Sequence, residues 1–354
     1  MENIGTKGQK LLIEKVIDKG ICVTCGACVG LCPYFDYYDG KVLVMDICNS
    51  NTWRCLQFCP QAGFEDTNPT VLSEKDAVDW PIGKYKKILI ARAKNVALRK
   101  QVQYGGIVSA ILGYALEEEL IESAVLTDKG NEGSPQGIIA HDREDILRCA
   151  GSRYTASAGL SALNKGIKSN KKNMAVVGLP CQMEAMARMR LMIPDGAERD
   201  SHIKLKIGLF CTWALDYRRI NKYLNKIGLR ERIIKYDIPP PPSQTFRILL
   251  EKTGWMKLSL DDIRPFIQKG CALCEDMTAE LSDISVGAVE GKEGWNTVIA
   301  RSETGAELID SAAKKNIIET DALPEANLVH LKDAALNKKR KGRAVKEDFG
   351  LGIS

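Results

Sequence analysis

The strongest restriction on the fold of this chain is a run of four closely spaced cysteines near its beginning. The run reads Cys22-Val-Thr-Cys25-Gly-Ala-Cys28-Val-Gly-Leu-Cys32-Pro. This spacing wraps three thiolates around a cubane iron–sulfur cluster and sends the fourth thiolate away at a proline turn. A zinc site is normally complete with two CxxC pairs and has no use for such a run. The run therefore predicts an iron–sulfur site, not a zinc site.

A later cysteine that precedes a proline, Cys59, completes one set of four ligands. In two-cluster ferredoxins the cysteine before each proline ligates the other cluster. On this rule, Cys22, Cys25, Cys28 and Cys59 are predicted to ligate one 4Fe-4S cluster.

The other cysteines of this segment, Cys32, Cys48 and Cys55, are predicted to belong to a second centre with an irregular ligand set. A regular motif has a cysteine where this sequence has Thr52, and the spacing from Cys48 to Cys55 is one residue too long. Three alternatives stay open. Asp46 or a cysteine from elsewhere completes the set, or the centre has three irons, or the cluster is lost.

Four further cysteines are dispersed along the chain. Cys181 and Cys211 each follow a short apolar run that is typical of a buried strand, and Cys271 and Cys274 form a CxxC pair. Ligand sites of α/β sheets gather at the carboxyl ends of strands, so two strand ends and one loop can supply four thiolates to a cluster. Taken singly, Cys181 and Cys211 are better explained as small buried hydrophobic residues, and only the four cysteines together favour a cluster. Cys149 has no companion and is predicted to be a packed thiol.

The composition excludes several classes of protein. With 354 residues, 45% of them hydrophobic, the chain is long enough for two domains and cannot be mainly disordered. Its 50 Lys and Arg against 45 Asp and Glu leave a net charge of +5, too even a balance for a typical nucleic-acid binder. The sequence has no uncharged apolar stretch of membrane-spanning length and no secretory leader. We therefore expect a cytoplasmic protein without a membrane span, and peripheral association with a membrane through partner subunits stays open.

The order of expected elements divides the chain into four parts. Residues 1–61 form a ferredoxin-like 4Fe-4S module, and residues 62–87 are a polar connector without periodicity. Residues 88–330 alternate strand and helix patterns, which predicts an α/β domain with a mixed sheet. Residues 331–354 are a basic tail whose run Lys338-Lys339-Arg340-Lys341 predicts a solvated end or a surface that docks on an acidic partner. The expected fold class is thus α+β in the module and α/β in the main domain.

Some common catalytic arrangements are missing from the sequence. No G-x-G-x-x-G loop follows a strand, so a nicotinamide or flavin site would have to be built in another way. The three histidines are scattered and are expected to be structural. No catalytic acid–base pair is predicted.

Seven ordered motifs resemble the coenzyme F420 hydrogenase/dehydrogenase beta subunit family, which includes F420-reducing hydrogenase, F420-dependent formate dehydrogenase and F420H2 dehydrogenase subunits. The motifs lie at residues 105–112, 150–157, 178–182, 208–211, 271–276, 283–287 and 294–297. This resemblance implies FAD in the α/β domain and a 4Fe-4S cluster on Cys181, Cys211, Cys271 and Cys274. Two clusters are expected in all, or three if the irregular centre is filled.

The resemblance also marks residues that would bind the flavin. They are Gly105, Gly106, Ser109, Gly151, Ser152, Arg153, Tyr154, Ser157, Gly178, Gln182, Trp295, Asn296 and Thr297. Adjacent glycines that open a helix bring backbone N–H groups to a pyrophosphate, and an arginine suits phosphate oxygens. Glycine and serine also cap helices, so a purely structural role is the alternative for these loops.

The expected activity is conversion between electron pairs and single electrons. A hydride would be exchanged with coenzyme F420 at FAD, and single electrons would pass through the clusters to other subunits of a hydrogenase, formate dehydrogenase or heterodisulfide reductase type of complex. The alternatives are the same flavoprotein using NAD(P)H or ferredoxin, and a flavin-free electron-relay subunit. Arg153 stands where the family often has lysine and Asn296 where it often has serine, which leaves the hydride carrier open.

Overall fold

The computed structural model describes residues 8–49, 53–62, 81–128, 134–192, 195–239 and 243–349. Most of the predicted connector and the position of Thr52 lie outside the described residues.

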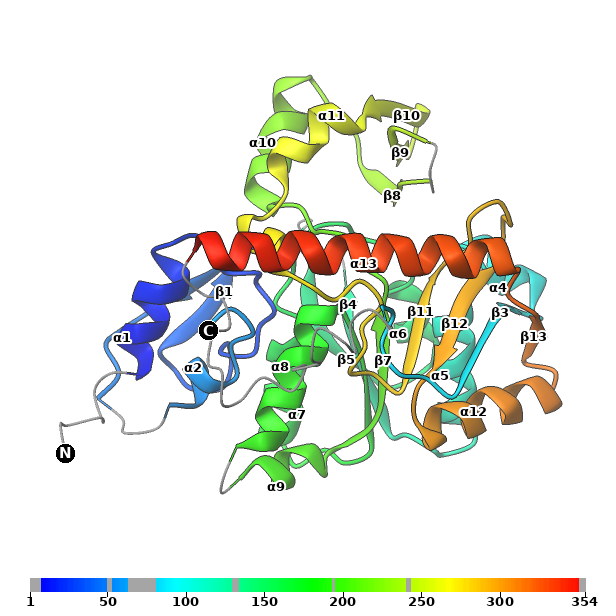
Figure 1. Ribbon diagram of the computed structural model, residues 1–354, viewed down its shortest axis with the longest axis horizontal. Coiled ribbons are helices and arrows are strands. Elements are labelled where there is room, and N and C mark those ends of the chain that lie inside the picture. Colours follow the sequence, from blue (N-terminus) through cyan, green and yellow to red (C-terminus); the bar gives the residue numbers. More distant parts are fainter. Residues whose placement is uncertain are drawn as a thin grey trace.

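A mixed sheet of eight strands forms the centre of the molecule (Figure 1). In spatial order the strands are β13 (Ile318–Asp321), β3 (Lys87–Ala93), β12 (Asn296–Ala300), β11 (Ile284–Ala288), β7 (Ile203–Leu209), β6 (Met174–Gly178), β4 (Ser123–Asp128) and β5 (Gln136–Ala140). Strands β11, β7, β6 and β4 run parallel, and the other neighbours pair antiparallel. The carboxyl ends of four central strands therefore meet at one edge, and the predicted mixed α/β sheet is confirmed.

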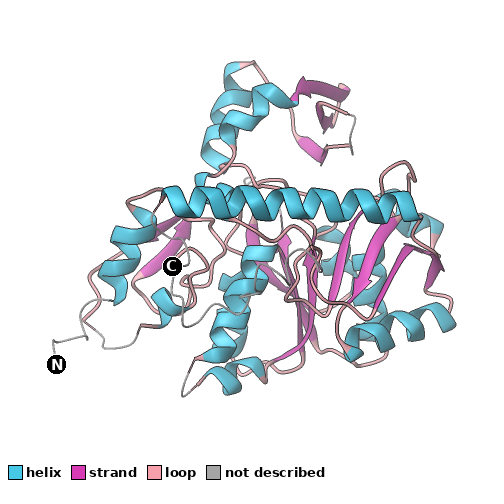
Figure 2. Cartoon of the chain, in the orientation of Figure 1, coloured by secondary structure: helices cyan, strands magenta, loops and turns pink. Residues whose placement is uncertain are grey.

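Helices cover both faces of this sheet (Figure 2). One face packs against α4 (Val96–Gln101), α5 (Ile107–Glu117), α6 (Arg143–Arg148) and α12 (Glu303–Lys314). The other packs against α7 (Leu160–Lys168) and α8 (Pro180–Leu191), which is followed by α9 (Gly196–Asp200). Successive residues of β4 contribute to the cores on opposite faces of the sheet. Ala124 and Leu126 lie in the core on the α5 side, and Val125 lies in the core on the α7–α8 side. Such strands read as continuous apolar runs, which made them predictable.

The cysteine-rich N-terminal segment forms a small module on the α7–α8 face. It consists of α1 (Gly8–Leu12), the π-helical turn η2 (Ile13–Ile17), the hairpin of β1 (Phe35–Tyr38) and β2 (Lys41–Val44), and α2 (Arg54–Gln57). Gly26, at φ 86°, lies so close to the main domain that an added Cβ would be 2.6 Å from the backbone of Ala158. Asn164 Nδ2 donates to the carbonyls of Ala27 and Val29 at 2.9 and 2.8 Å. The module is thus docked by backbone contacts.

A second lobe stands above the body in Figure 1. It contains α10 (Tyr217–Lys226), the antiparallel strands β8 (Ile233–Asp237), β9 (Thr245–Leu250) and β10 (Gly254–Ser259), α11 (Leu260–Ile263) and the 3-10 turn η4 (Arg264–Phe266). Strands β9 and β10 pair antiparallel as a hairpin. From this lobe the chain returns to the sheet edge through η5 (Lys269–Leu273), which carries the first cysteine of the CxxC pair.

The basic run, predicted as a solvated end or a docking surface, lies in the long helix α13 (Glu325–Asp348), which includes the boundary expected at residue 330. The helix, red in Figure 1, crosses the molecule from β13 to the N-terminal module. Lys339 is only 6% exposed, whereas Arg340 and Lys341 face solvent. Because successive side chains of a helix point in different directions, the run has both a buried residue and residues in solvent. No helix in the described part of the chain has the length and apolarity that a membrane crossing requires.

Candidate functional site

A cavity of about 600 Å³ opens at the carboxyl edge of the central strands. Its walls come from the ends of β4, β6, β7 and β11, the loop 149–157, the β8–β10 lobe, and α13 through Asn327, His330, Leu331 and Ala334. A volume of this size lies within the range of small-molecule and cofactor sites. Crevices at this edge are where open α/β sheets bind ligands.

Most of the residues predicted to bind flavin line this cavity. They are Gly106, Ser109, Gly151, Ser152, Arg153, Tyr154, Ser157, Gly178, Gln182, Asn296 and Thr297. Two others, Gly105 and Trp295, are not among its lining residues. Trp295 is buried beside β3, with the cations of Arg92 and Lys292 each 4.5 Å from its ring centroid. Trp295 is therefore a packing residue in this structure.

The glycine pair shapes the start of α5. Gly106 is the N-cap of the helix and has φ 73°, a conformation that costs glycine little. An added Cβ on Gly105 would lie 2.8 Å from Asn296 Oδ1 and 2.9 Å from the carbonyl oxygen of Ala91, so only glycine fits there. The cap has no side-chain hydrogen bond, and the first turn of α5 lines the cavity through Ile107 and Ser109. The positive end of this helix thus faces the cavity.

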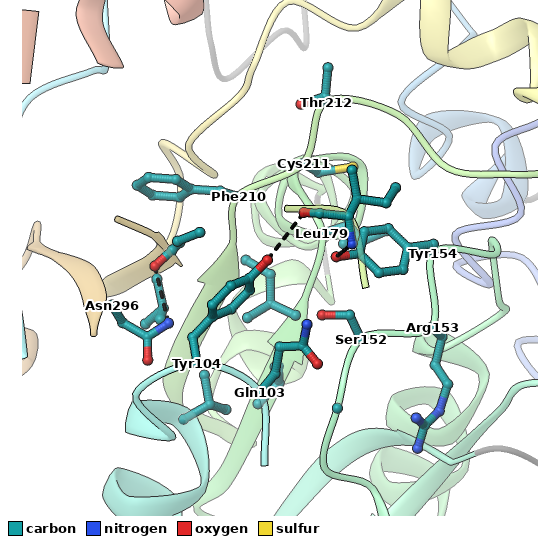
Figure 3. A pocket seen from close by; sticks show the side chains of 18 of the residues that line it. Gln103, Tyr104, Ser152, Arg153, Tyr154, Leu179, Phe210, Cys211, Thr212 and Asn296 are labelled. Carbon is teal, nitrogen blue, oxygen red and sulfur yellow. Dashed lines mark hydrogen bonds between the residues drawn. The ribbon is translucent and has the colours of Figure 1, made fainter. Parts of the chain in front are cut away.

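Two buried polar atoms in the cavity wall lack a protein hydrogen-bond partner among the described residues. They are Arg153 Nε and Gln103 Oε1. Figure 3 shows Arg153 and Ser152 on one loop of the wall. Burial lowers the pKa of the Arg153 guanidinium. A buried unsatisfied polar group costs about 1–3 kcal/mol, and more when it is charged, so the site is suited to a ligand that supplies an acceptor.

Sequence reasoning missed a tyrosine at the rim of the cavity. The hydroxyl of Tyr104, which has φ 50°, donates to the carbonyl of Ile238 at 3.2 Å, and the hydroxyl of Tyr154 accepts from Ile238 N–H at 3.2 Å (Figure 3). Burial raises the pKa of both phenols, which therefore stay neutral donors. The pair joins the sheet edge to the β8–β10 lobe. Only its position beside the glycine pair could have drawn attention to Tyr104.

Four dispersed cysteines meet beside this cavity, as the sequence predicts. Cys181 follows β6 at the start of α8, Cys211 follows β7, and Cys271 and Cys274 lie in and just after η5. Burial raises the pKa of Cys181 well above its usual value, and the neighbouring charges of Cys25, Cys274, Cys211 and Cys271 add to the rise. Cys211 also lines the cavity. We call Cys181, Cys211, Cys271 and Cys274 the sheet-edge thiols.

The chemistry of the sheet-edge thiols suits an iron–sulfur cluster. Burial raises the pKa of Cys211 to about 12 and that of Cys271 to about 11, so the thiolates need a cationic partner to form. Among the described residues no three His, Cys, Asp or Glu side chains are placed to hold one metal ion. A four-iron cluster is larger than one ion, so its ligands stand further apart. A set made only of thiolates is typical of such clusters.

The N-terminal cysteines form two further groups of neighbours. Burial is the main cause that raises the pKa of Cys28 well above its usual value. The charges of four neighbouring cysteines raise it further: Cys22, Cys25, Cys59 and Cys55. The structure therefore brings the four predicted ligands of the first cluster together. We call Cys22, Cys25, Cys28 and Cys59 the N-terminal thiols.

The three cysteines of the irregular centre are also close together. Burial raises the pKa of Cys55 to about 11, and the charges of Cys32 and Cys48 raise it further. The carboxylate of Asp46, the alternative fourth ligand, accepts from the backbone N–H of Ile47 at 2.7 Å. Cys28 and Cys55 interact electrostatically, so this group adjoins the N-terminal thiols.

The N-terminal thiols also adjoin the sheet-edge thiols. Cys25 is the strongest charged neighbour of Cys181. Gln182 Nε2 donates to the carbonyl of Cys25 at 3.3 Å, and an added Cβ on Gly270 would be 2.0 Å from the carbonyl oxygen of Ile21. The thiol groups therefore form a continuous series from the cavity to the outer side of the module.

The sequence matches both halves of one family. Residues 88–164 match the N-terminal part and residues 171–326 the C terminus of the coenzyme F420 hydrogenase/dehydrogenase beta subunit. The chain is 30% identical to the coenzyme F420 hydrogenase subunit beta of Methanothermobacter thermautotrophicus, over 76% of this chain and 98% of that protein. It is 29% identical to the coenzyme F420-dependent sulfite reductase of Methanocaldococcus jannaschii, over 90% of this chain but only 50% of that protein.

A solved structure has a similar fold. A chain of the F420-reducing NiFe hydrogenase complex from Methanosarcina barkeri superposes with a TM-score of 0.70 at 28% identity, covering 76% of this chain and 93% of that one. The hydrogenase subunit beta, which matches along nearly its whole length, and the hydrogenase complex are named as redox proteins, consistent with a cavity lined by a thiol group. The chain therefore belongs to the coenzyme F420 hydrogenase/dehydrogenase beta subunit family of oxidoreductases.

Proposed function

We propose that this protein is a flavin and iron–sulfur subunit that exchanges a hydride with coenzyme F420 in the cavity and passes single electrons to a partner complex. In this proposal residues 88–330 form the FAD-binding domain, residues 1–61 the ferredoxin-like module, and residues 62–87 their connector. The observation that carries the proposal is the position of Cys211, which lines the cavity and also belongs to the sheet-edge thiols.

The cavity wall supports FAD as the bound cofactor. The positive end of α5 and the unpartnered Arg153 Nε offer donors for an anionic group such as a pyrophosphate. Gly105 packs against Ala91 and Asn296 with no room for a side chain, which holds the turn that directs the start of α5 to the cavity. Bound FAD would supply the chemistry that links hydride transfer to one-electron transfer.

The thiol groups support a path for single electrons. The sheet-edge thiols would hold one 4Fe-4S cluster next to the cavity, and the N-terminal thiols a second one next to that. Cys32, Cys48 and Cys55 would hold a third centre on the outer side of the module. A partner complex, of the hydrogenase, formate dehydrogenase or heterodisulfide reductase type, would exchange electrons there.

The first test is cofactor content after anaerobic purification and reconstitution. We expect about one FAD per chain, with about eight irons if one N-terminal cluster forms and about eleven or twelve if both form. Reduced F420 should bleach the flavin absorbance under anaerobic conditions. A colourless supernatant after acid precipitation would overturn the flavin site, and bleaching by NADH but not by reduced F420 would overturn the choice of hydride carrier.

An arginine substitution tests the location of the flavin. Arg153→Met removes the buried guanidinium from the cavity wall and should weaken FAD binding roughly 10-fold to 100-fold, because a hydrogen bond to a charged group is worth about 1.5–3 kcal/mol. Arg148→Met removes an exposed arginine that pairs with Asp128 at 3.2 Å and serves as the matched control. Equal FAD retention in the two variants would contradict the proposed site.

A further inference from the structure

One lysine of α13 reaches the segments that carry the sheet-edge thiols. Lys338 Nζ donates to the carbonyl of Cys211 at 2.6 Å and to the carbonyl of Asp276 at 2.8 Å. The first carbonyl follows β7 and the second follows the CxxC pair, so one ammonium group bridges both backbones that present these thiols. The sequence marked Lys338 only as part of the basic run, and the family resemblance assigned it no role at the site.

The charge of Lys338 is directed at the thiols. Burial raises the pKa of Cys274, Cys211 and Cys271, and Lys338 is the opposing charge that lowers each of them. Burial lowers the pKa of Lys338 itself, but the side chains of Cys274, Cys211 and Asp276 outweigh burial and raise it. Lys338 therefore remains an ammonium beside the thiols at neutral pH.

The carboxylates of Glu275 and Glu280 near the CxxC pair already have other partners on α13. Arg343 and Lys346 pair with Glu275 at 3.0 and 2.7 Å, and Lys339 pairs with Glu280. Lys338 makes no ion pair with a carboxylate among the residues that the structure describes. These contacts hold α13 against the loop independently of Lys338, which leaves its charge available to a group held by the thiols.

Gly342 brings α13 close enough for this arrangement. An added Cβ at Gly342 would lie 2.9 Å from the carbonyl oxygen of Cys274. The helix axis thus passes next to the CxxC pair, one turn after Lys338. This contact fixes the backbone of α13 beside the CxxC pair, and the two carbonyl hydrogen bonds hold the Lys338 ammonium there.

We propose that Lys338 is a positioning residue that raises the reduction potential of the centre held by the sheet-edge thiols. The inference rests on the proposed function in one respect, that these thiols hold a 4Fe-4S cluster. Reduction adds a negative charge to the cluster, and a nearby cation with N–H donors stabilises that charge. Lys338 would make this centre a better electron acceptor for the cavity and would leave the more distant N-terminal centres less affected.

The test is a redox titration of the full chain followed by electron paramagnetic resonance. The signal of the sheet-edge centre is assigned as the one that Cys271→Ser removes. Lys338→Met keeps the length of the side chain without its charge. We expect the ratio of reduced to oxidised centre at a fixed ambient potential to fall about tenfold, which is a shift of 59 mV to more negative potential for one electron.

Three comparison variants separate charge from structure. Lys338→Arg keeps the charge and should restore most of the wild-type potential. Lys338→Gln keeps a hydrogen-bond donor without charge and carries the test if the methionine variant does not load iron. Lys341→Met removes an exposed lysine from the same helix and should leave the potential unchanged.

Each outcome decides for or against the proposal. An unchanged potential in Lys338→Met or Lys338→Gln at wild-type iron content overturns it. Loss of iron from both neutral variants but not from Lys338→Arg also overturns it, because Lys338 would then hold the site together instead of setting its potential. If the wild-type protein binds iron but Cys271→Ser removes no signal, the proposed function fails at the sheet-edge site, whatever Lys338 does.

Discussion

The N-terminal thiols and the sheet-edge thiols make similar groups by different routes. The N-terminal thiols come from one short segment, in which Cys22, Cys25 and Cys28 share a single loop. The sheet-edge thiols come from two parallel strand ends and a loop that returns from the β8–β10 lobe. The first group is therefore built by local spacing and the second by sheet topology. A ligand group of the first kind can be recognised from residue spacing alone. A group of the second kind can be recognised only when the order of the strands in the sheet is known.

The difference extends to the surroundings of each group. The segment after the CxxC pair is embedded in buried charges: Arg301, only partly exposed, donates to Ser285 Oγ at 2.6 Å and to the Thr278 carbonyl at 3.2 Å, and Lys339 pairs with Glu280. Cys22, Cys28 and Cys59 pack instead against an apolar core with Leu12, Ile21 and Leu56, and the Arg188 charge acts on Cys59 only as a minor influence. We therefore expect the sheet-edge group to respond more strongly to changes in charge.

The largest expected effect separates the two groups by single cysteine substitutions. Cys271→Ser and Cys28→Ser should each remove about four irons per chain, because each takes away a ligand of a different cluster. In Cys28→Ser the sheet-edge centre should still be reduced at the wild-type rate after reduced F420 is added. In Cys271→Ser reduction of the N-terminal centres should slow at least 100-fold, because the intervening centre is missing. Iron assays measure the iron content, and rapid-mixing absorbance spectroscopy measures the rates of reduction.

The control is Cys149→Ser, which changes a cavity-lining cysteine outside both groups. It should keep its full iron content and its rate of reduction. Wild-type reduction of the N-terminal centres in Cys271→Ser would show that the two groups do not act in series.

The N-terminal site and most of the sheet could be predicted from sequence for clear physical reasons. Ligands that are two or three residues apart can surround one cluster whatever the rest of the chain does. Central strands buried on both faces give apolar runs, such as the run before Cys181 that forms β6, Met174–Gly178. The edge strand Ile318–Asp321 was missed, because its exposed face is polar and it is only four residues long.

The role of α13 could not be predicted, because its buried side is not apolar. Its buried positions include Ala335, Lys339 and Gly342, which give no hydrophobic periodicity. Four successive basic residues usually indicate a solvated segment. Here two of them are satisfied by groups far away in the sequence, Glu280 for Lys339 and the Cys211 carbonyl for Lys338. Such contacts depend on tertiary structure alone.

A smaller effect, on the free energy of unfolding, is expected at the contact between the loops that carry the sheet-edge thiols and the N-terminal thiols. Gly270→Ala places a Cβ 2.0 Å from the carbonyl oxygen of Ile21, so the η5 loop and the N-terminal loop must separate. Overpacking of this kind costs about 1–3 kcal/mol of unfolding free energy. Gly113→Ala in α5 is the matched control, since its nearest neighbour would be 3.6 Å away, an ordinary contact. Urea unfolding should show a loss in Gly270→Ala and little change in Gly113→Ala, and equal midpoints would contradict the close docking.

A further expected effect is a pH dependence from a buried carboxyl group behind the CxxC pair. Burial, followed by the charge of Asp276, raises the pKa of Glu280 from 4.5 to about 7 despite its pairing with Lys339. Below pH 4.5 the carboxyl is protonated in both the folded and the unfolded chain. Between pH 4.5 and 7 the unfolded chain releases the proton while the folded chain keeps it, so stability from this group is lost as the pH rises. The loss is on the order of 3 kcal/mol.

Glu280→Gln removes the titrating carboxyl group and so isolates its contribution to the pH dependence of the unfolding free energy. The wild-type advantage in unfolding free energy over Glu280→Gln should shrink between pH 5 and pH 7.5 and then level off. Glu251→Gln changes an exposed carboxylate that pairs with Arg232 at 3.2 Å, and its curve should run parallel to the wild type. If the Glu280→Gln curve is also parallel, the buried charges behind the CxxC pair do not titrate with folding. The sheet-edge surroundings would then be no more sensitive to pH than the apolar core of the N-terminal module.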